Sequence, residues 1–123
     1  MLRVLYERIA GLDVHKKTVV ACVRAPVDGA KKRSDRESEV RTFATTTRAL
    51  LELHDWLSEC DITHVAMEST GVYWRPVYNI LEGAFELLLV NARHVKNVPG
   101  RKTDVKDCEW LAQLLEHGLL RSS

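Results

Sequence analysis

Two acidic residues lie in stretches of sequence that are otherwise apolar. Asp13 stands in RIAGLDV and Glu68 in HVAMES. A carboxylate buried in such a strand is strongly disfavoured unless a cation or hydrogen-bond donors compensate it. The alternative is that each acid lies at the end of its strand, in water or bound to a backbone N–H. Together the two predict a pair of carboxylates at the edge where open α/β sheets form their crevices.

A second acidic pair, Asp104 and Asp107, has helical spacing. The two residues are three positions apart, so a helix would place both on one face. The same face continues through Cys108 and Leu111, which predicts that these acids point toward a sheet. The competing explanation is that aspartates at a helix start cap free N–H groups and complement the helix dipole, a task that Thr103 can share.

Four converging carboxylates could not all stay ionised without bound cations. Two Mg²⁺ or Mn²⁺ ions, about 3.5–4 Å apart, would satisfy them and form the arrangement used for in-line attack on phosphodiesters. One ion would activate the attacking water or hydroxyl, and the other would stabilise the leaving oxygen. Oxygen donors favour these hard cations over zinc. The predicted catalytic and metal-binding residues are Asp13, Glu68, Asp104 and Asp107.

The rest of the chain predicts the elements that must position these acids. Two apolar runs around residues 15–18 favour an antiparallel hairpin, and polar–apolar alternation over 39–44 favours a third strand. Helices then alternate with strands, which is typical of a mixed sheet covered by helices. We expect one α/β domain over residues 1–123, with a mixed five-stranded sheet. Its later elements are a helix from Thr47 as its cap to about Cys60, a strand over 64–69, a helix over 73–81, a strand over 85–90 and a helix over 104–117.

Basic residues concentrate between Arg93 and Lys106, although the formal net charge of the chain is only +1. An electrostatic footprint for nucleic acid must therefore be local, and the alternative is an ordinary solvated loop. The expected nucleic-acid contacts are Lys16, Lys17, Arg93, Lys96, Arg101, Lys102 and Lys106. The three cysteines lack metal-binding spacing, and no apolar run reaches the roughly 20 residues of a membrane span, so we expect reduced thiols in a cytoplasmic protein.

Three blocks of sequence, GLDVHK, MESTG and KTDVKD in that order, resemble the N-terminal domain of the DEDD transposases of bacterial insertion sequences. Each block is weak alone, but together they are specific, and the resemblance covers nearly the whole chain. It implies a domain similar to the RuvC Holliday-junction resolvase, with a ribonuclease-H-like fold. It also implies that Asp13, Glu68, Asp104 and Asp107 are the four acids of the family, and that the partners are DNA, a structured guide RNA and further copies of the protein.

The resemblance has one large departure. Family members continue into a second domain that carries a serine nucleophile, whereas this sequence stops at Ser123. We therefore expect this polypeptide to bind metal without completing strand exchange alone. We do not expect Ser122 or Ser123 to replace that nucleophile, because the sequence predicts a frayed terminus there.

Two other functions compete with a transposase domain. The first is a non-catalytic DNA- or RNA-binding and oligomerisation module of the same fold, in which the acids serve as caps and strand ends. The second is an actin-like or sugar-kinase-like ATPase. That class places a glycine-rich phosphate loop beside the first hairpin, whereas Gly11 stands alone before Asp13, which disfavours it.

Overall fold

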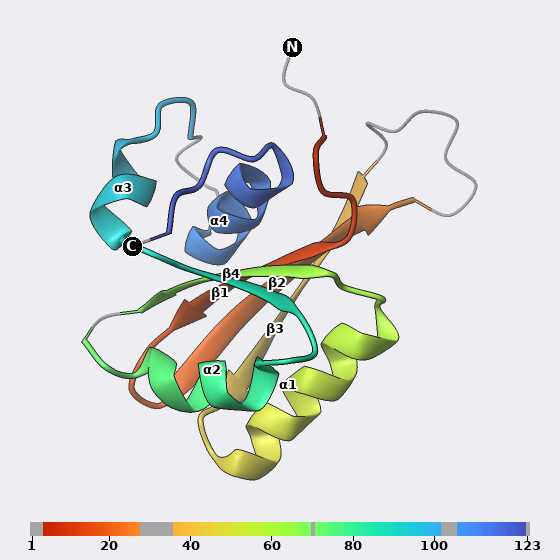
Figure 1. Ribbon diagram of the computed structural model, residues 1–123, viewed down its shortest axis with the longest axis vertical. Helices are drawn as coiled ribbons and strands as arrows, with labels where there is room; N and C mark the ends of the chain where they lie inside the picture. The colour runs from red at the N-terminus through yellow and green to blue at the C-terminus, as the bar shows by residue number, and fades with distance from the viewer. Residues whose placement is uncertain (1–3, 28–35, 70, 102–105, 123) are drawn as a thin grey trace.

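β1 (Ile9–Val14) is the central strand of a five-stranded sheet with the order β3-β2-β1-β4-β5. The structure is a computed structural model that describes residues 4–27, 36–69, 71–101 and 106–122, apart from the side chains of residues 94, 96 and 97. In Figure 1 the sheet crosses the middle of the molecule, with helices above and below it. The other elements are β2 (Thr18–Pro26), β3 (Arg36–Ala44), α1 (Thr47–Glu59), β4 (His64–Ser69), α2 (Trp74–Leu81), β5 (Glu86–Val90), α3 (Ala92–Asn97) and α4 (Asp107–Glu116).

The sheet combines antiparallel and parallel pairing. β1 is antiparallel to β2, and β2 is antiparallel to β3. β4 is parallel to β1, and β5 is parallel to β4. The mixed five-stranded sheet expected from the sequence is therefore confirmed. Because β1, β4 and β5 run in one direction, their carboxyl ends lie at one edge of the sheet, where parallel folds place their functional groups.

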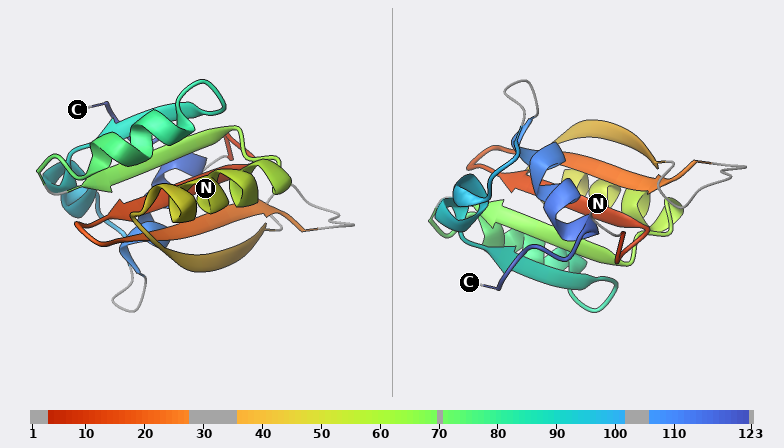
Figure 2. Two further views of the ribbon diagram at one scale, coloured as in Figure 1. Left: turned by 90° about the horizontal axis from the view of Figure 1, so that it is seen from below. Right: turned by 90° about the horizontal axis from the view of Figure 1, so that it is seen from above.

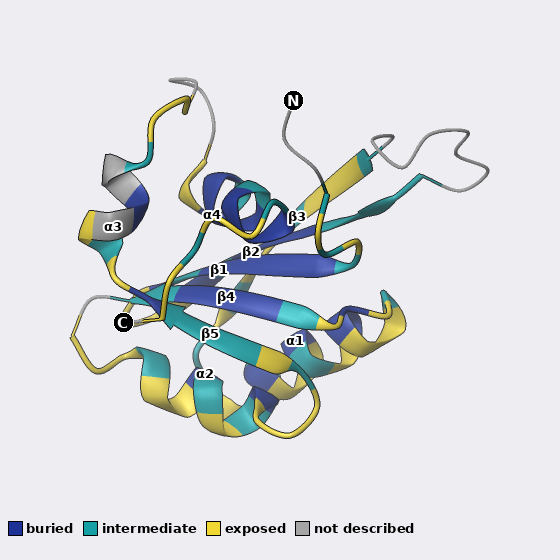
Figure 3. Ribbon diagram, turned by 45° about the horizontal axis from the view of Figure 1, so that its top comes forward, coloured by how far each residue is buried: buried dark blue, intermediate teal, exposed yellow. Residues whose placement is uncertain are grey.

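Side chains alternate along β1 and so divide the core into two layers. Ala10, Leu12 and Val14 pack with buried residues of α1 and α2. Ile9 packs on the opposite face with buried residues of α3 and α4. Figure 2 shows the two pairs of helices on opposite sides of the sheet, and Figure 3 shows that β1 and most of β4 are buried between them. By the same alternation, Asp13 belongs to the face that α4 covers.

The structure differs from expectation at the start of α1 and by an additional helix after β5. The N-cap of α1 is Thr46 rather than Thr47, because the Thr46 hydroxyl accepts a hydrogen bond from the Ala49 N–H at 3.2 Å. A short helix, α3, lies within the basic stretch, where the sequence predicted no element. It begins where the Asn91 side chain accepts a hydrogen bond from the Arg93 N–H at 2.8 Å.

The last helix begins later than expected. α4 starts at Asp107, and its N-cap Lys106 has extended backbone and no capping side-chain bond. Asp107 is thus the first residue of the helix, and Asp104 lies outside the described residues. No helix in the described ranges combines the length and apolar character needed to cross a membrane.

Candidate active site

Asp13 and Glu68 occupy paired positions on neighbouring parallel strands. In the register of β1 with β4, the Cα of Asp13 is the partner of the Cα of Glu68, one residue before each strand ends. Paired residues of adjacent strands project from the same face, and the strands are about 4.8 Å apart. The structure therefore brings together two acids that are remote in the sequence, at the carboxyl edge of the sheet.

Asp13 is mostly buried and accepts a hydrogen bond from a histidine of the next turn. Its side chain is 15% exposed, whereas that of His15 is 53% exposed. The His15 Nε2 atom lies 3.0 Å from Asp13 Oδ2. The polar environment of Asp13 is therefore supplied by a side chain that the sequence analysis did not assign to the site.

The backbone of α4 lies directly against β1 beside Gly11. A Cβ atom added to Gly11 would lie 2.4 Å from the Cys108 carbonyl oxygen and 2.7 Å from the Ala112 nitrogen. Both are backbone atoms, so only a residue without a side chain permits this approach. Because Gly11 and Asp13 project from the same face, the first turn of α4 is brought toward Asp13.

The electrostatics of Cys108 agree with this placement. Burial, together with the negative charges of Glu109 and Asp13, raises the pKa of the Cys108 thiol to about 11. A carboxylate influences a thiol in this way only when the two are close. Asp13 and the first turn of α4 are therefore on the same side of the sheet.

Asp107 itself is turned toward solvent. Its side chain is 47% exposed, and its Oδ1 atom lies 2.8 Å from Arg101 Nη2. The expectation that the acids of the last helix point toward the sheet is wrong for Asp107 in this structure. As the first residue of α4, it lies at the helix end rather than on the buried stripe through Cys108 and Leu111.

A complete set of metal ligands is not assembled within the described residues. Across residues 4–27, 36–69, 71–101 and 106–122, no three histidine, cysteine, aspartate or glutamate side chains are close enough together to hold a metal ion. Asp13 and Glu68 nevertheless form an oxygen-only pair on one face of the sheet, and this donor chemistry fits Mg²⁺ or Mn²⁺.

Basic side chains lie at the same edge of the sheet as the acids. Lys16 and Lys17 are exposed in the turn that follows β1. Val90 ends β5 as the partner of Glu68, so α3 and its exposed Arg93 follow directly from this edge. Of the other predicted contacts, Arg101 and Lys106 are exposed, whereas Lys102 and the side chain of Lys96 lie outside the description.

A buried hydrogen bond holds α3 against α4. The Trp110 indole Nε1–H donates to the Val95 carbonyl oxygen at 3.1 Å, and both residues are buried. α3, at the start of the basic segment, is therefore held by β5 before it and by α4 against it.

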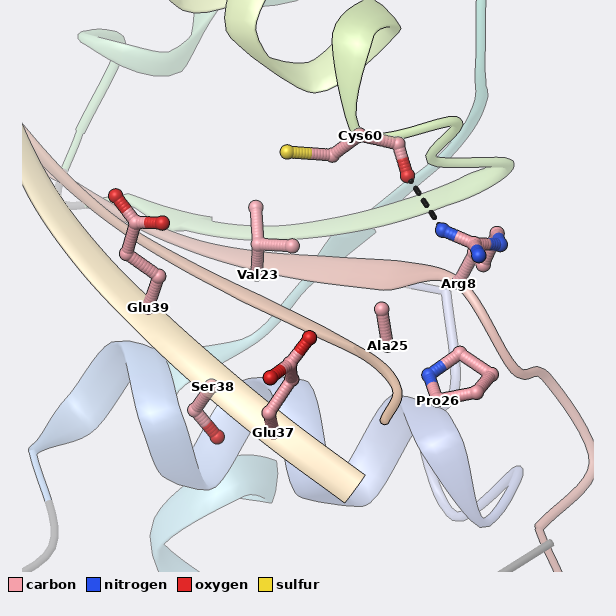
Figure 4. Close-up of a pocket in the computed structure, with 8 residues that line it drawn as sticks. All are labelled: Arg8, Val23, Ala25, Pro26, Glu37, Ser38, Glu39 and Cys60. Atoms are coloured by element: carbon pink, nitrogen blue, oxygen red, sulfur yellow. Dashed lines mark hydrogen bonds between the residues drawn. The ribbon is translucent and has the colours of Figure 1, made fainter. Parts of the chain in front are cut away.

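The pocket in Figure 4 lies away from these acids. It has a volume of about 400 Å³, and none of the predicted acids lines it. Arg8 contributes to it from just before β1, at the opposite end of that strand from Asp13, and donates from Nη1 to the Cys60 carbonyl oxygen at 2.9 Å. The acid pair at the carboxyl edge therefore lies outside this pocket.

Comparison with known proteins decides the family. A family model for DEDD transposases, described as Transposase, matches residues 10–123. The chain belongs to this transposase family. No curated protein sequence matches it.

Solved structures similar to this transposase-family chain show its fold. The structure of RuvC from Thermus thermophilus is 12% identical with a TM-score of 0.57, and the similarity covers 93% of this chain and 98% of that one. T. thermophilus RuvC in complex with a Holliday junction substrate gives the same values. The chain therefore has the ribonuclease-H-like fold of RuvC, as expected.

Two residues of this transposase-family domain contribute to the site although the sequence analysis did not assign them. Both belong to the GLDVHK block that carries the family resemblance, but His15 was otherwise placed only in the polar turn of a hairpin and Gly11 only in an apolar strand. A glycine inside a strand is itself a signal, since it often marks the close approach of another backbone. For His15 the family block was the signal, but it did not reveal the contact with Asp13, which depends on the conformation of the turn.

Proposed function

We propose that this chain is the metal-dependent catalytic domain of a DNA transposase, which cleaves and rejoins phosphodiesters at the ends and target of an insertion sequence. The observation that carries the proposal is the pairing of Asp13 with Glu68 at the carboxyl edge of the sheet, in a chain of the transposase family. A RuvC protein of the same fold has been solved with a Holliday junction substrate, which supports DNA as the substrate.

Asp13, Glu68, Asp104 and Asp107 would hold two Mg²⁺ or Mn²⁺ ions in this proposal. The ions would supply a strengthened nucleophile and charge stabilisation at the leaving oxygen. The role of Asp13 and Glu68 is to present two carboxylates from adjacent, hydrogen-bonded strands, so that their backbone positions are fixed before a ligand arrives. Asp107 would join them by exchanging its ion pair with Arg101 for the shared site.

The nucleic acid would be held mainly through its phosphates. The exposed Lys16, Lys17 and Arg93 lie at the edge of the sheet that carries the acid pair, and they supply local positive charge in a chain of nearly neutral net charge. Such contacts supply affinity and register rather than sequence choice. From the family resemblance we propose that a structured guide RNA selects the target, and that the protein acts as a homo-oligomer in the bacterial cytoplasm. We further propose that residues 1–123 act as one domain and need the serine of the family's second domain for recombination.

Calorimetric titration with Mn²⁺ tests the metal site. Asp13→Asn and Glu68→Gln are each expected to abolish detectable binding, because each removes a charged ligand and leaves the fold's contacts in place. Asp55→Asn is the matched control, since Asp55 is an exposed acid of α1 on the opposite face of the sheet. Wild-type affinity in Asp13→Asn would contradict the proposal.

One observation favours a second function. Asp107 is exposed and paired with Arg101, as expected if the acids of the last helix serve only its stability. The chain would then be a non-catalytic DNA- or RNA-binding and oligomerisation module with the same fold. The two functions are distinguished by the titration, because the module would bind nucleic acid but show no saturable Mn²⁺ binding.

A further inference from the structure

A histidine in the turn after β1 is hydrogen-bonded to the first acid of the site. His15 Nε2 lies 3.0 Å from Asp13 Oδ2. An ionised carboxylate can only accept hydrogen bonds, so Nε2 carries the proton and donates it to this oxygen. The bond involves one carboxylate oxygen of Asp13, at the boundary between the buried strand and solvent.

The turn that carries His15 is fixed to the rest of the fold. The His15 N–H donates to the Thr18 carbonyl oxygen at 2.8 Å and closes the hairpin. Thr45 then holds the tip of the turn, because its hydroxyl donates to the Lys16 carbonyl oxygen at 2.9 Å and its N–H donates to the Lys17 carbonyl oxygen at 3.2 Å. Three backbone carbonyls of the turn are thus satisfied by protein donors, so the imidazole is presented from a defined backbone position.

We propose that His15 is a positioning residue for Asp13, an inference that rests on the metal site proposed above. The imidazole N–H engages Oδ2 and leaves Oδ1 as the oxygen directed to the metal ion. Hydrogen bonds of this kind orient ligating carboxylates and limit their rotation, and their loss typically weakens metal binding about 10–100-fold. Asp13 therefore acts as a one-oxygen ligand whose orientation is set by the hairpin turn.

The opposite arrangement makes a different prediction. The His15 imidazole could instead bond to the carboxylate oxygen that a metal ion needs. An arriving cation would then have to displace the imidazole from Asp13. Removing the imidazole would then strengthen metal binding. The sign of the change in affinity on removing His15 distinguishes the two.

Mn²⁺ titration of His15 variants provides the test. His15→Ala is expected to weaken Mn²⁺ binding on the order of 10-fold, and His15→Gln, which keeps an N–H donor at a similar distance from the backbone, is expected to recover most of it. His54→Ala is the matched control, because His54 makes a comparable 3.2 Å contact with Asp55 on α1. It should leave the affinity unchanged.

Nitrogen NMR of the His15 ring gives a second readout that needs no enzymatic activity. At a pH at which imidazole is neutral, the ring should show a protonated Nε2 both before and after Mg²⁺ is added. Unchanged or tighter Mn²⁺ binding in His15→Ala, or loss of the Nε2–H signal on adding Mg²⁺, would overturn the inference. Loss of binding in Asp13→Asn alongside an unaffected His15→Ala would reject only the role of His15. Retained binding in Asp13→Asn would reject the metal site itself.

Discussion

Gly11 is the residue on which the approach of α4 to the acid pair depends. A methyl group at this position would meet two backbone atoms of α4 at 2.4 and 2.7 Å, and backbone cannot rotate away as a side chain can. We predict that Gly11→Ala forces α4 outward and lowers the free energy of unfolding by about 1–3 kcal/mol, as overpacking does in other cores. Urea unfolding followed by tryptophan fluorescence measures the loss.

Hydrogen exchange separates this local effect from general destabilisation. In Gly11→Ala, amides of α4 should exchange faster than in the wild type under native conditions, because the helix opens without the rest of the molecule. Amides of α1, which packs on the opposite face of the sheet, serve as the internal control. Equal protection of α4 in the two proteins would show that the helix tolerates the methyl group.

Cys22 lies beneath α4 as the strand partner of Gly11. Burial raises the pKa of its thiol to about 12, from an ordinary value of 9.0. The unfolded chain therefore loses this proton at a lower pH than the folded protein does, so stability is lost as the pH rises above about 9. Cys22→Ala should reduce the steepness of that loss by up to about 1.4 kcal/mol per pH unit.

The comparison requires urea unfolding of both proteins under reducing conditions, from neutral pH to about one unit above the ordinary pKa of a thiol. Lysine and tyrosine titrations affect the two proteins alike, so the difference between them isolates Cys22. Parallel loss of stability in the two proteins would mean that the thiol is not buried as described.

At the scale of elements, α4 is held at both ends by charged contacts. Its first residue, Asp107, pairs with Arg101 at the surface. Its last residue, Glu116, is 1% exposed and accepts from Arg24 of β2 at 3.1 Å and also pairs with Arg36 of β3. Burial lowers the pKa of Arg36, and the charge of Glu116 opposes that shift. The second contact connects the far end of α4 to two strands that do not carry the acids.

We predict that Glu116→Gln lowers the free energy of unfolding by about 3 kcal/mol, because it leaves two guanidinium groups without a buried counter-charge. Glu39→Gln is the matched control, since Glu39 pairs with Arg41 at 2.6 Å with both side chains about half exposed. Its loss should be below about 1 kcal/mol. Thermal and urea unfolding of the two variants measure the difference, and equal losses would contradict the distinction between buried and exposed pairs.

Element type was predictable from the sequence, whereas some boundaries were not. HVAMES was predicted as a strand over 64–69 and is β4 over that range, because an apolar run between polar neighbours has few alternatives. The start of α4 was misplaced because Thr103, Asp104 and Asp107 all suit a helix start, and local capping signals do not rank them. β3 was predicted to begin at Glu39 and begins at Arg36, since its largely exposed face gives a weak alternation.

At the scale of the molecule, the sequence predicted which strands the first acids occupy but not the contacts around them. Asp13 and Glu68 could be placed at one edge because parallel order follows from alternating helices and strands. The bond from His15 depends on the turn, and the buried pairing of Glu116 depends on three elements that meet only in the folded chain. Short-range sequence patterns carry no information on either contact.

The distribution of positive charge over the whole molecule determines how nucleic-acid binding should depend on salt. With a net charge of only +1, affinity for nucleic acid has to come from local clusters of basic residues, and in the proposed function Lys16 and Lys17 at the carboxyl edge of the sheet belong to such a cluster. Each phosphate contact releases counterions, so each lost contact should reduce the slope of log K against log salt by about 0.9 for duplex DNA. We therefore expect a reduction of about 0.9 in Lys16→Gln or Lys17→Gln, and about twice that in the double variant.

Arg41→Gln is the control for these lysine variants, because it removes one positive charge from β3 and should leave the slope of log K against log salt unchanged. Fluorescence anisotropy with labelled duplexes of unrelated sequence measures these slopes, and they should not depend on the sequence used. If Arg41→Gln reduced the slope as much as Lys16→Gln, the nucleic acid would have to follow β3 rather than the edge that holds Asp13 and Glu68.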